Sequence, residues 1–273
     1  MPPINPRQLA LDCLLESDVQ RKLALTAAAS AAIASNSNWT LTPDTPPIVT
    51  IPLPGRPQNP QLVAPNQLRQ RKLNSDAGRA ALVHAVAHIE FNAINLAWDA
   101  VYRFPDMPVA YYRDWASVAA DEARHFKLLA DRLAQLGHAY GDFPAHDGLW
   151  QMALDTDADV LVRMALVPRV LEARGLDVTP GMIDRLRRVG DLATIEALNV
   201  ILSEEVRHVA IGSHWYRQVC AERGLEPKAS FLQLLQAHAI VLRLPFNDSA
   251  RLAAGFDRQE LEALAAFAGS GQR

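Results

Sequence analysis

Cysteine, long apolar runs and a secretion signal are scarce or missing in this sequence. The two cysteines, Cys13 and Cys220, lie far apart and lack the spacing of a thiolate metal site. The first residues, MPPINPRQ, lack the charged and then apolar order of a secretion signal. The longest apolar stretch, residues 23–34, is well short of the roughly 20 residues that span a bilayer. We therefore expect a cytoplasmic protein in a reducing setting, with no transmembrane segment and no membrane partner.

A strong charge of one sign and strand patterns are also lacking. Lys and Arg number 27 against 30 Asp and Glu, and no basic stretch is long enough for a nucleic-acid footprint, which argues against nucleic acid as a partner. No segment alternates apolar and polar residues as a half-buried strand does. With 273 residues, 49% of them hydrophobic, the chain can bury the core of one large domain or two small ones. The sequence predicts a soluble, all-α protein.

Helical periodicity, prolines and glycines divide the chain. Residues 5–35 are predicted to form a helix that packs outside the main bundle. Residues 36–75 contain eight prolines, each of which fixes a backbone angle and removes a donor, so we expect an extended arm there. Four long helices follow at about residues 76–103, 108–137, 157–174 and 191–223, with stops at Gly137, Gly175 and Gly224, a crossover over about 137–156 and a short helix from Pro180. Further helices are expected near 230–242 and 258–267, on either side of a break at 245–247.

Two closely joined helices, a crossover and two more helices match the one-crossover topology of ferritin-like folds. The predicted fold class is all-α, a ferritin-like four-helix bundle with an extra N-terminal helix, a Pro-rich extended arm and additional C-terminal helices. The predicted domains are residues 1–75 for the N-terminal helix and the arm, which pack on the bundle, 76–225 for the bundle itself, and 226–273 for a C-terminal helical extension.

One short motif occurs twice. The second long helix contains DEARH and the fourth contains EEVRH. Residues three apart share one face of a helix, so Glu122 with His125, and Glu205 with His208, each form a two-ligand claw. A di-metal centre in such a bundle needs one further Glu from each of the other two helices.

Glu90 and Glu172 meet that requirement. Glu90 lies in the first helix, 32 positions before Glu122, and Glu172 lies in the third, 33 positions before Glu205. Both have apolar neighbours in the sequence, where an unpaired charge would be costly and a bound cation would remove the cost. The predicted metal ligands are Glu90, Glu122, His125, Glu172, Glu205 and His208.

The donor types indicate the metal. Carboxylate oxygens with one imidazole per metal suit two iron ions, with manganese or a mixed manganese and iron pair as alternatives. The acids and arginines beside the ligands are expected to pair between adjacent helices and to hydrogen-bond the ligating imidazoles. These outer residues are Asp121, Arg124, Glu204 and Arg207.

Each element has a simpler interpretation when it is taken alone. A single Glu-x-x-His is more often an exposed pair on a helix face, and Glu90 or Glu172 alone suits the surface. Only together do they favour a metal site. His84 and His88 are four apart, but neither falls on the Glu90 face, so they are more simply structural histidines than ligands. Pro168 would kink the third helix one turn before Glu172, which would either open the metal pocket or accommodate packing.

Longer stretches carry a resemblance to known families. HIEFNAINLAWDAVYRFPDMP, DEARHF, LGHAYGDFPAHDGLW, VPRVLEARGLDVTPGM, EEVRHVAIGSHW and LPFNDSARLAAGF, which lie between His84 and about Gly255, resemble a bacterial ferritin-like family catalogued as domain of unknown function 455. The repeated motif is also similar to that of bacterial multicomponent monooxygenases, and EARGLD looks like a stretch of the tRNA-modifying di-iron hydroxylases. These resemblances imply the same six ligands, with Glu204 standing where the monooxygenase motif usually has Asp.

Three functions fit this site. The leading hypothesis is an oxygen-dependent oxidoreductase, in which a reduced di-iron pair binds dioxygen and the oxidised centre hydroxylates or otherwise oxidises a small-molecule substrate, supplied with electrons by an external donor. The second is a metal-handling or peroxide-consuming protein that has the same site and no organic substrate. The third is a non-catalytic scaffold that the metal stabilises. The oligomeric state stays open, with a homodimer as one option.

Overall fold

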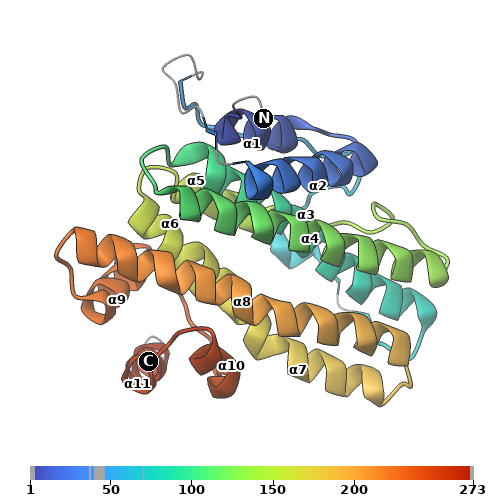
Figure 1. Ribbon diagram of the computed structural model, residues 1–273. Helices are drawn as coiled ribbons and strands as arrows, with labels where there is room; N and C mark the ends of the chain where they lie inside the picture. Colours follow the sequence, from blue (N-terminus) through green and yellow to red (C-terminus); the bar gives the residue numbers. More distant parts are fainter. Residues whose placement is uncertain (1–3, 37, 40–46, 70, 271–273) are drawn as a thin grey trace. The chain divides into compact units, whose positions relative to one another are not determined.

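The computed structural model describes residues 4–36, 38–39, 47–69 and 71–270, and in this part of the chain the regular elements are all helices, without a named strand (Figure 1). The prediction of an all-α protein is therefore confirmed. The α-helices are α1 (Pro6–Leu15), α2 (Val19–Ser35), α3 (Asp76–Arg103), α4 (Val109–Gln135), α5 (Gly148–Asp155), α6 (Val160–Leu166), α7 (Ala173–Arg187), α8 (Leu192–Glu222), α9 (Pro227–Ala237), α10 (Asp248–Ala253) and α11 (Arg258–Ser270). A short 3-10 helix, η1 (Pro65–Gln67), lies in the arm, and a π-helix, η2 (Val167–Glu172), follows α6.

The chain forms two compact units. The first comprises Met1–Leu154 and Leu186–Ala197, and the second comprises Asp155–Arg185 and Leu198–Arg273. The segment 76–225, predicted to be one bundle, contributes α3 and α4 to the first unit and α6, η2, most of α7 and most of α8 to the second. The predicted division into three domains stays a prediction.

The first unit is built on α3 and α4. These two helices pack along each other, α1 packs on α3, and α2 packs on α4 and α1 (Figure 1). Helix α3 begins after Ser75, whose hydroxyl accepts the N–H of Gly78, and it ends before Pro105, as the sequence predicts. Among the described helices, α3 alone is long and apolar enough to cross a membrane, but 78% of that stretch is buried, as in a core helix of a soluble protein.

The N-terminal prediction of a single helix over residues 5–35 is wrong. Helix α1 ends at Leu15, and α2 begins after Asp18, whose side chain accepts the N–H of Arg21. Asp18 is an N-cap residue, so it starts a new helix where apolar periodicity alone continues the old one. Because the chain changes direction at this break, the side chain of Lys22 reaches the end of α1. Its ammonium group donates to the carbonyls of Cys13 and Leu14, at 2.8 and 3.3 Å, and to Asn95 Oδ1 of α3 at 2.7 Å.

Residues 47–69 of the arm run without helix apart from η1, as their prolines predict, whereas residues 37, 40–46 and 70 of the predicted arm lie outside the described residues. The arm pairs with two other segments of the first unit. The N–H of Gly55 donates to the Leu14 carbonyl at 2.7 Å, and that of Val63 to the Ala145 carbonyl at 2.8 Å. A Cβ at Gly55 would lie 2.3 Å from the carbonyl oxygens of Leu15 and Glu16, so only glycine permits this close approach.

In the second unit, the predicted helix end at Gly175 and the predicted helix start at Pro180 are both wrong, because α6, η2 and α7 form one continuous helical segment. Pro180 lies inside α7 and cannot donate to the carbonyl of Leu176, four residues earlier. The side chain of Asn247 donates to that carbonyl instead, at 3.1 Å. A residue 71 positions away thereby satisfies the group that the proline leaves without its helical partner.

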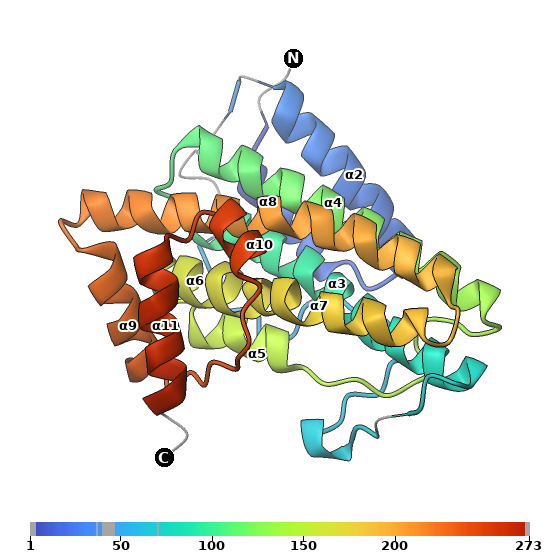
Figure 2. The ribbon, with the colours of Figure 1, turned by 90° about the horizontal axis from the view of Figure 1, so that it is seen from below.

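The C-terminal helices contact the continuous segment α6–η2–α7. Asp177 of α7 accepts two hydrogen bonds, at 2.9 and 2.7 Å, from Arg251 of α10, a helix that the sequence did not predict. Helices α9 and α11 lie side by side (Figure 2). Their side chains Phe231 and Glu260 both contact the buried guanidinium of Arg169 in η2.

Candidate metal centre

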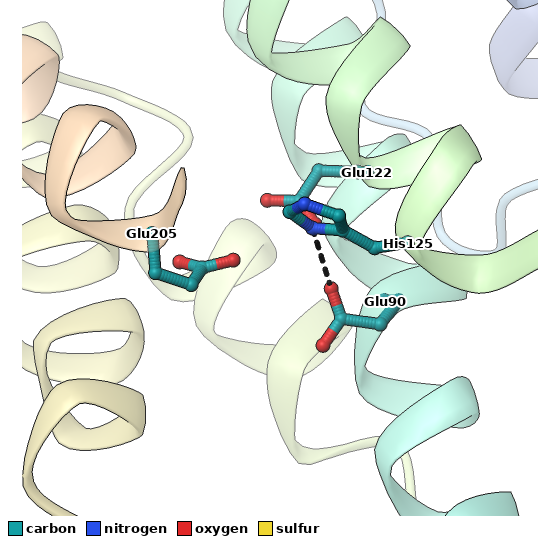
Figure 3. Close-up of side chains that lie close together, drawn as sticks. All are labelled: Glu90, Glu122, His125 and Glu205. Atoms are coloured by element: carbon teal, nitrogen blue, oxygen red, sulfur yellow. Dashed lines mark hydrogen bonds and ion pairs between the residues drawn. The ribbon is translucent and has the colours of Figure 1, made fainter. Parts of the chain in front are cut away.

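Three predicted ligands meet in the first unit. Glu90 comes from α3, and Glu122 and His125 come from neighbouring turns of α4 (Figure 3). The Nδ1 atom of His125 lies 3.3 Å from an oxygen of Glu122 and 3.4 Å from an oxygen of Glu90. One ligand atom from each residue lies within 4.8 Å of the others, and all three side chains are buried. The described residues therefore contain a buried Glu/His group that could hold a metal ion.

Local structure explains why these residues meet. Helices α3 and α4 are joined by the short turn at residues 104–108, so they run antiparallel and pack along their lengths. Glu122 and His125 are three apart and share the face of α4 that meets α3. The expected pairing of one Glu from the first long helix with the claw of the second is present in the structure.

The charges of this group depend strongly on one another. Burial alone would lower the pKa of His125, but the hydrogen bonds and negative charges of Glu122 and Glu90 outweigh it and raise that pKa to about 11. In the absence of a metal ion, the imidazole is thus held as a cation between two carboxylates. A bound divalent cation would displace that proton and supply two positive charges in its place.

The second unit contains the other three predicted ligands. His208 is fully buried in α8, and its Nδ1 lies 3.5 Å from an oxygen of Glu205. Glu172 is the last residue of η2 and is half-buried. Each unit thus holds one Glu-x-x-His claw and one further Glu, as the repeated motif predicts. Their assembly into one set of six ligands stays a prediction.

The outer acids and arginines are only partly defined. Arg124 donates to Asp121 at 2.6 Å, but both residues lie on α4, and the Arg124 side chain is about half exposed. Glu204 is half-buried and Arg207 is exposed on α8. The predicted pairing between adjacent helices and the hydrogen bonds to the imidazoles stay predictions for all four.

Comparison with known proteins shows which family the chain belongs to. Residues 15–262 match the family described as "Protein of unknown function (DUF455)". The chain belongs to the DUF455 family. It is also 45% identical over 214 residues to a protein of Haemophilus influenzae (strain ATCC 51907 / DSM 11121 / KW20 / Rd) described as "Uncharacterized protein", a match that covers 76% of this chain and 74% of that protein. No solved structure matches the chain.

Two histidines of this DUF455 chain have partners away from the ligands. His88 Nδ1 lies 2.8 Å from the hydroxyl of Tyr140, and its Nε2 lies 3.1 Å from the His146 carbonyl. His84 Nε2 accepts the N–H of Gly141 at 2.9 Å. Burial lowers the pKa of both His84 and His88 to about 4, which keeps them neutral. These contacts agree with their interpretation as structural histidines.

Tyr140 is a neighbour of the site that sequence reasoning missed. Its ring centroid lies 5.5 Å from that of Phe91 and 4.9 Å from that of Phe126, the residues that follow Glu90 and His125. Tyr140 lies in the loop after α4, where no helical pattern indicates which side chains turn inward. Only the folded chain brings it to this aromatic cluster.

Proposed function

We propose that this DUF455 protein is a ferritin-like di-iron protein in which the two claws converge on one metal centre. Glu90, Glu122 and His125 would bind the first ion, and Glu172, Glu205 and His208 the second. We propose that the carboxylate of Glu205 links the two halves of the centre. Manganese, or one ion of each metal, would suit the same oxygen and nitrogen donors.

The observation that carries this proposal is the buried group of the first unit. Two carboxylates within 3.4 Å of one imidazole nitrogen, all three buried, form a donor set of the kind that di-iron sites use. Burial of two carboxylates is costly without compensating positive charge. The residues present therefore fit a divalent cation. The motif that builds this group recurs on α8, which supports a second ion.

The order of the helices supports the ferritin-like interpretation. The long helices α3 and α4, the continuous segment α6–η2–α7 and the long helix α8 follow one another in the order of the predicted bundle. Among the connections between these four segments, the one from α4 to α6 is the longest, and its only α-helix is the short α5. We propose that these four segments pack as a one-crossover bundle.

We further propose that the protein is an oxygen-dependent oxidoreductase of a small-molecule substrate, working with an external electron donor in the cytoplasm. A bound pair of iron ions would supply the activation of dioxygen. The protein would position the ions through the six ligands. The buried rings of Phe91 and Phe126, whose centroids lie 5.5 Å apart, would keep water out of the core beside Glu90 and His125.

The test begins with anaerobic loading of the purified chain with Fe(II), followed by metal analysis. We expect two ions per chain, and an absorption band of an oxo-bridged iron pair after exposure to air.

Glu122→Ala and His208→Ala should lose half or all of the metal, because each claw serves the pair. Glu196→Gln is the matched control, since Glu196 is an exposed residue of α8. Failure of the wild type to bind metal would refute the proposal. Metal binding without an iron-pair band or oxygen uptake would leave a metal that only stabilises the fold.

A further inference from the structure

A proline and a glycine bring η2 unusually close to α8 within the second unit. A Cβ built at Gly212 of α8 would lie 2.2 Å from both Cβ and Cγ of Pro168 in η2. Real Cβ contacts are never that short, and the proline ring is rigid, so only the hydrogen of glycine fits between the two segments. The pyrrolidine ring thus rests directly on the backbone of α8.

The same proline accounts for the π-helix. Pro168 has no N–H, so it cannot donate to the carbonyl of residue 164, four positions earlier, as an α-helix requires. In a π-turn, each N–H reaches the carbonyl five positions back, and the N–H of Ala173 donates to the Pro168 carbonyl in this way. The turn takes in one extra residue, which rotates the side chains after it by about 100° relative to an uninterrupted helix. Glu172 is the last residue of this turn.

Two contacts along these segments show where the Pro168–Gly212 contact lies relative to the predicted ligands. Asp159, before α6, pairs with Arg223, after α8, at 2.8 Å, and Pro168 meets Gly212. As residue numbers rise along α6 and η2, the numbers of the facing residues on α8 fall, so these two helical segments run antiparallel. One further helical turn beyond the contact leads to Glu172 on one segment and His208 on the other, since each is four residues away.

We infer that Gly212 is a positioning residue for the second half of the metal centre, because it admits Pro168 and so fixes the distance and rotation of Glu172 relative to His208. This inference rests on the proposed di-metal function. Neither Gly212 nor Pro168 offers a ligand atom. Both act by setting the helix spacing one turn from the ligands, where metal geometry tolerates displacements of only about 0.5 Å.

The test compares metal binding by the full-length wild type, Gly212→Ala and Gly175→Ala. Gly175 is a helical glycine three residues after Glu172, and a Cβ there meets nothing within 4 Å, so Gly175→Ala should bind two ions like the wild type. In Gly212→Ala, the added methyl group must push η2 from α8. We expect affinity for the second ion to fall about tenfold to hundredfold, as for other outer contacts of a metal site, while the first ion stays bound. Circular dichroism reports whether the helices remain.

Pro168→Ala keeps the inference testable if Gly212→Ala does not fold. This change adds no bulk, restores the missing N–H and allows an α-helical turn, so Glu172 should rotate and the second ion should bind about tenfold more weakly or worse. Two ions bound with wild-type affinity in either folded variant would overturn the inference and leave the proposed function intact. A wild type that binds no metal would refute the proposed function itself.

Discussion

The buried ion pair between Arg169 and Glu260 offers a sharp test of what holds the C-terminal helices to the second unit. The Arg169 side chain is fully buried in η2, and Glu260 of α11 is 5% exposed. The rings of Tyr216, Phe231 and Phe256 lie 4.7, 4.5 and 4.5 Å from the guanidinium carbon. Burial leaves little water to solvate this cation and lowers the pKa of Arg169.

Glu260→Gln removes the negative charge and keeps the shape of the side chain. The amide oxygen of the new side chain can still accept a hydrogen bond from Arg169, but the negative charge that balances Arg169 is gone, and a second cation, Arg217, lies 3.7 Å from Glu260 in the wild type. Breaking a buried pair from one side costs about 3–5 kcal/mol, because the other charge stays buried. We expect a loss near 3 kcal/mol, which is about a hundredfold in the folding equilibrium.

Urea unfolding followed by circular dichroism measures this loss. The matched control is Arg223→Ala, which removes a pair with Asp159 in the same unit, 2.8 Å apart, in which 41% and 35% of the two side chains are exposed. An exposed pair contributes at most about 1 kcal/mol. Arg169→Met combined with Glu260→Leu should recover most of the loss, since a packed apolar pair carries no desolvation cost. The reasoning fails if Glu260→Gln costs no more than Arg223→Ala.

Three further predictions concern the first unit. Asp191→Ala should lower the free energy of unfolding by about 2–4 kcal/mol in urea melts, because Asp191 caps α8 and accepts from Arg132 at 2.8 Å, and a loss below 1 kcal/mol would contradict this role. His84 should account for up to about 3 kcal/mol of the stability that the wild type loses as pH falls from about 6.5 to about 4, because the pKa of His84 is near 4 when folded, so only the unfolded imidazole takes up a proton in that range. Melts at pH 7 and 4.5 should show a smaller loss for His84→Gln, and equal losses would refute this account. Trp98→Phe should cost about 1–3 kcal/mol in thermal or urea unfolding, because it leaves the buried Thr26 hydroxyl without its donor at 3.0 Å, and a neutral result would count against that bond.

The sequence predicts those features whose causes lie within a few residues of one another. Helix α3 has the predicted bounds, and α8 matches its predicted range to within one residue at each end, because a capping serine, a following proline and a stop glycine act over a single turn. The Glu122 and His125 pair follows from helical periodicity alone. That Glu90 joins them followed from the packing of long antiparallel helices, which the short connection between α3 and α4 imposes.

Tertiary structure decided the features whose causes lie far apart in the chain. Pro180 reads as a helix start, yet α7 runs through it because Asn247 supplies the donor that proline lacks. Pro168 lacks the N–H that an α-helix requires, and its ring lies against α8 because Gly212 has no side chain. A local pattern shows which group a residue lacks, such as the N–H that proline does not have or the side chain that glycine does not have. Only the fold determines which distant residue then donates the missing hydrogen bond or fills the free space.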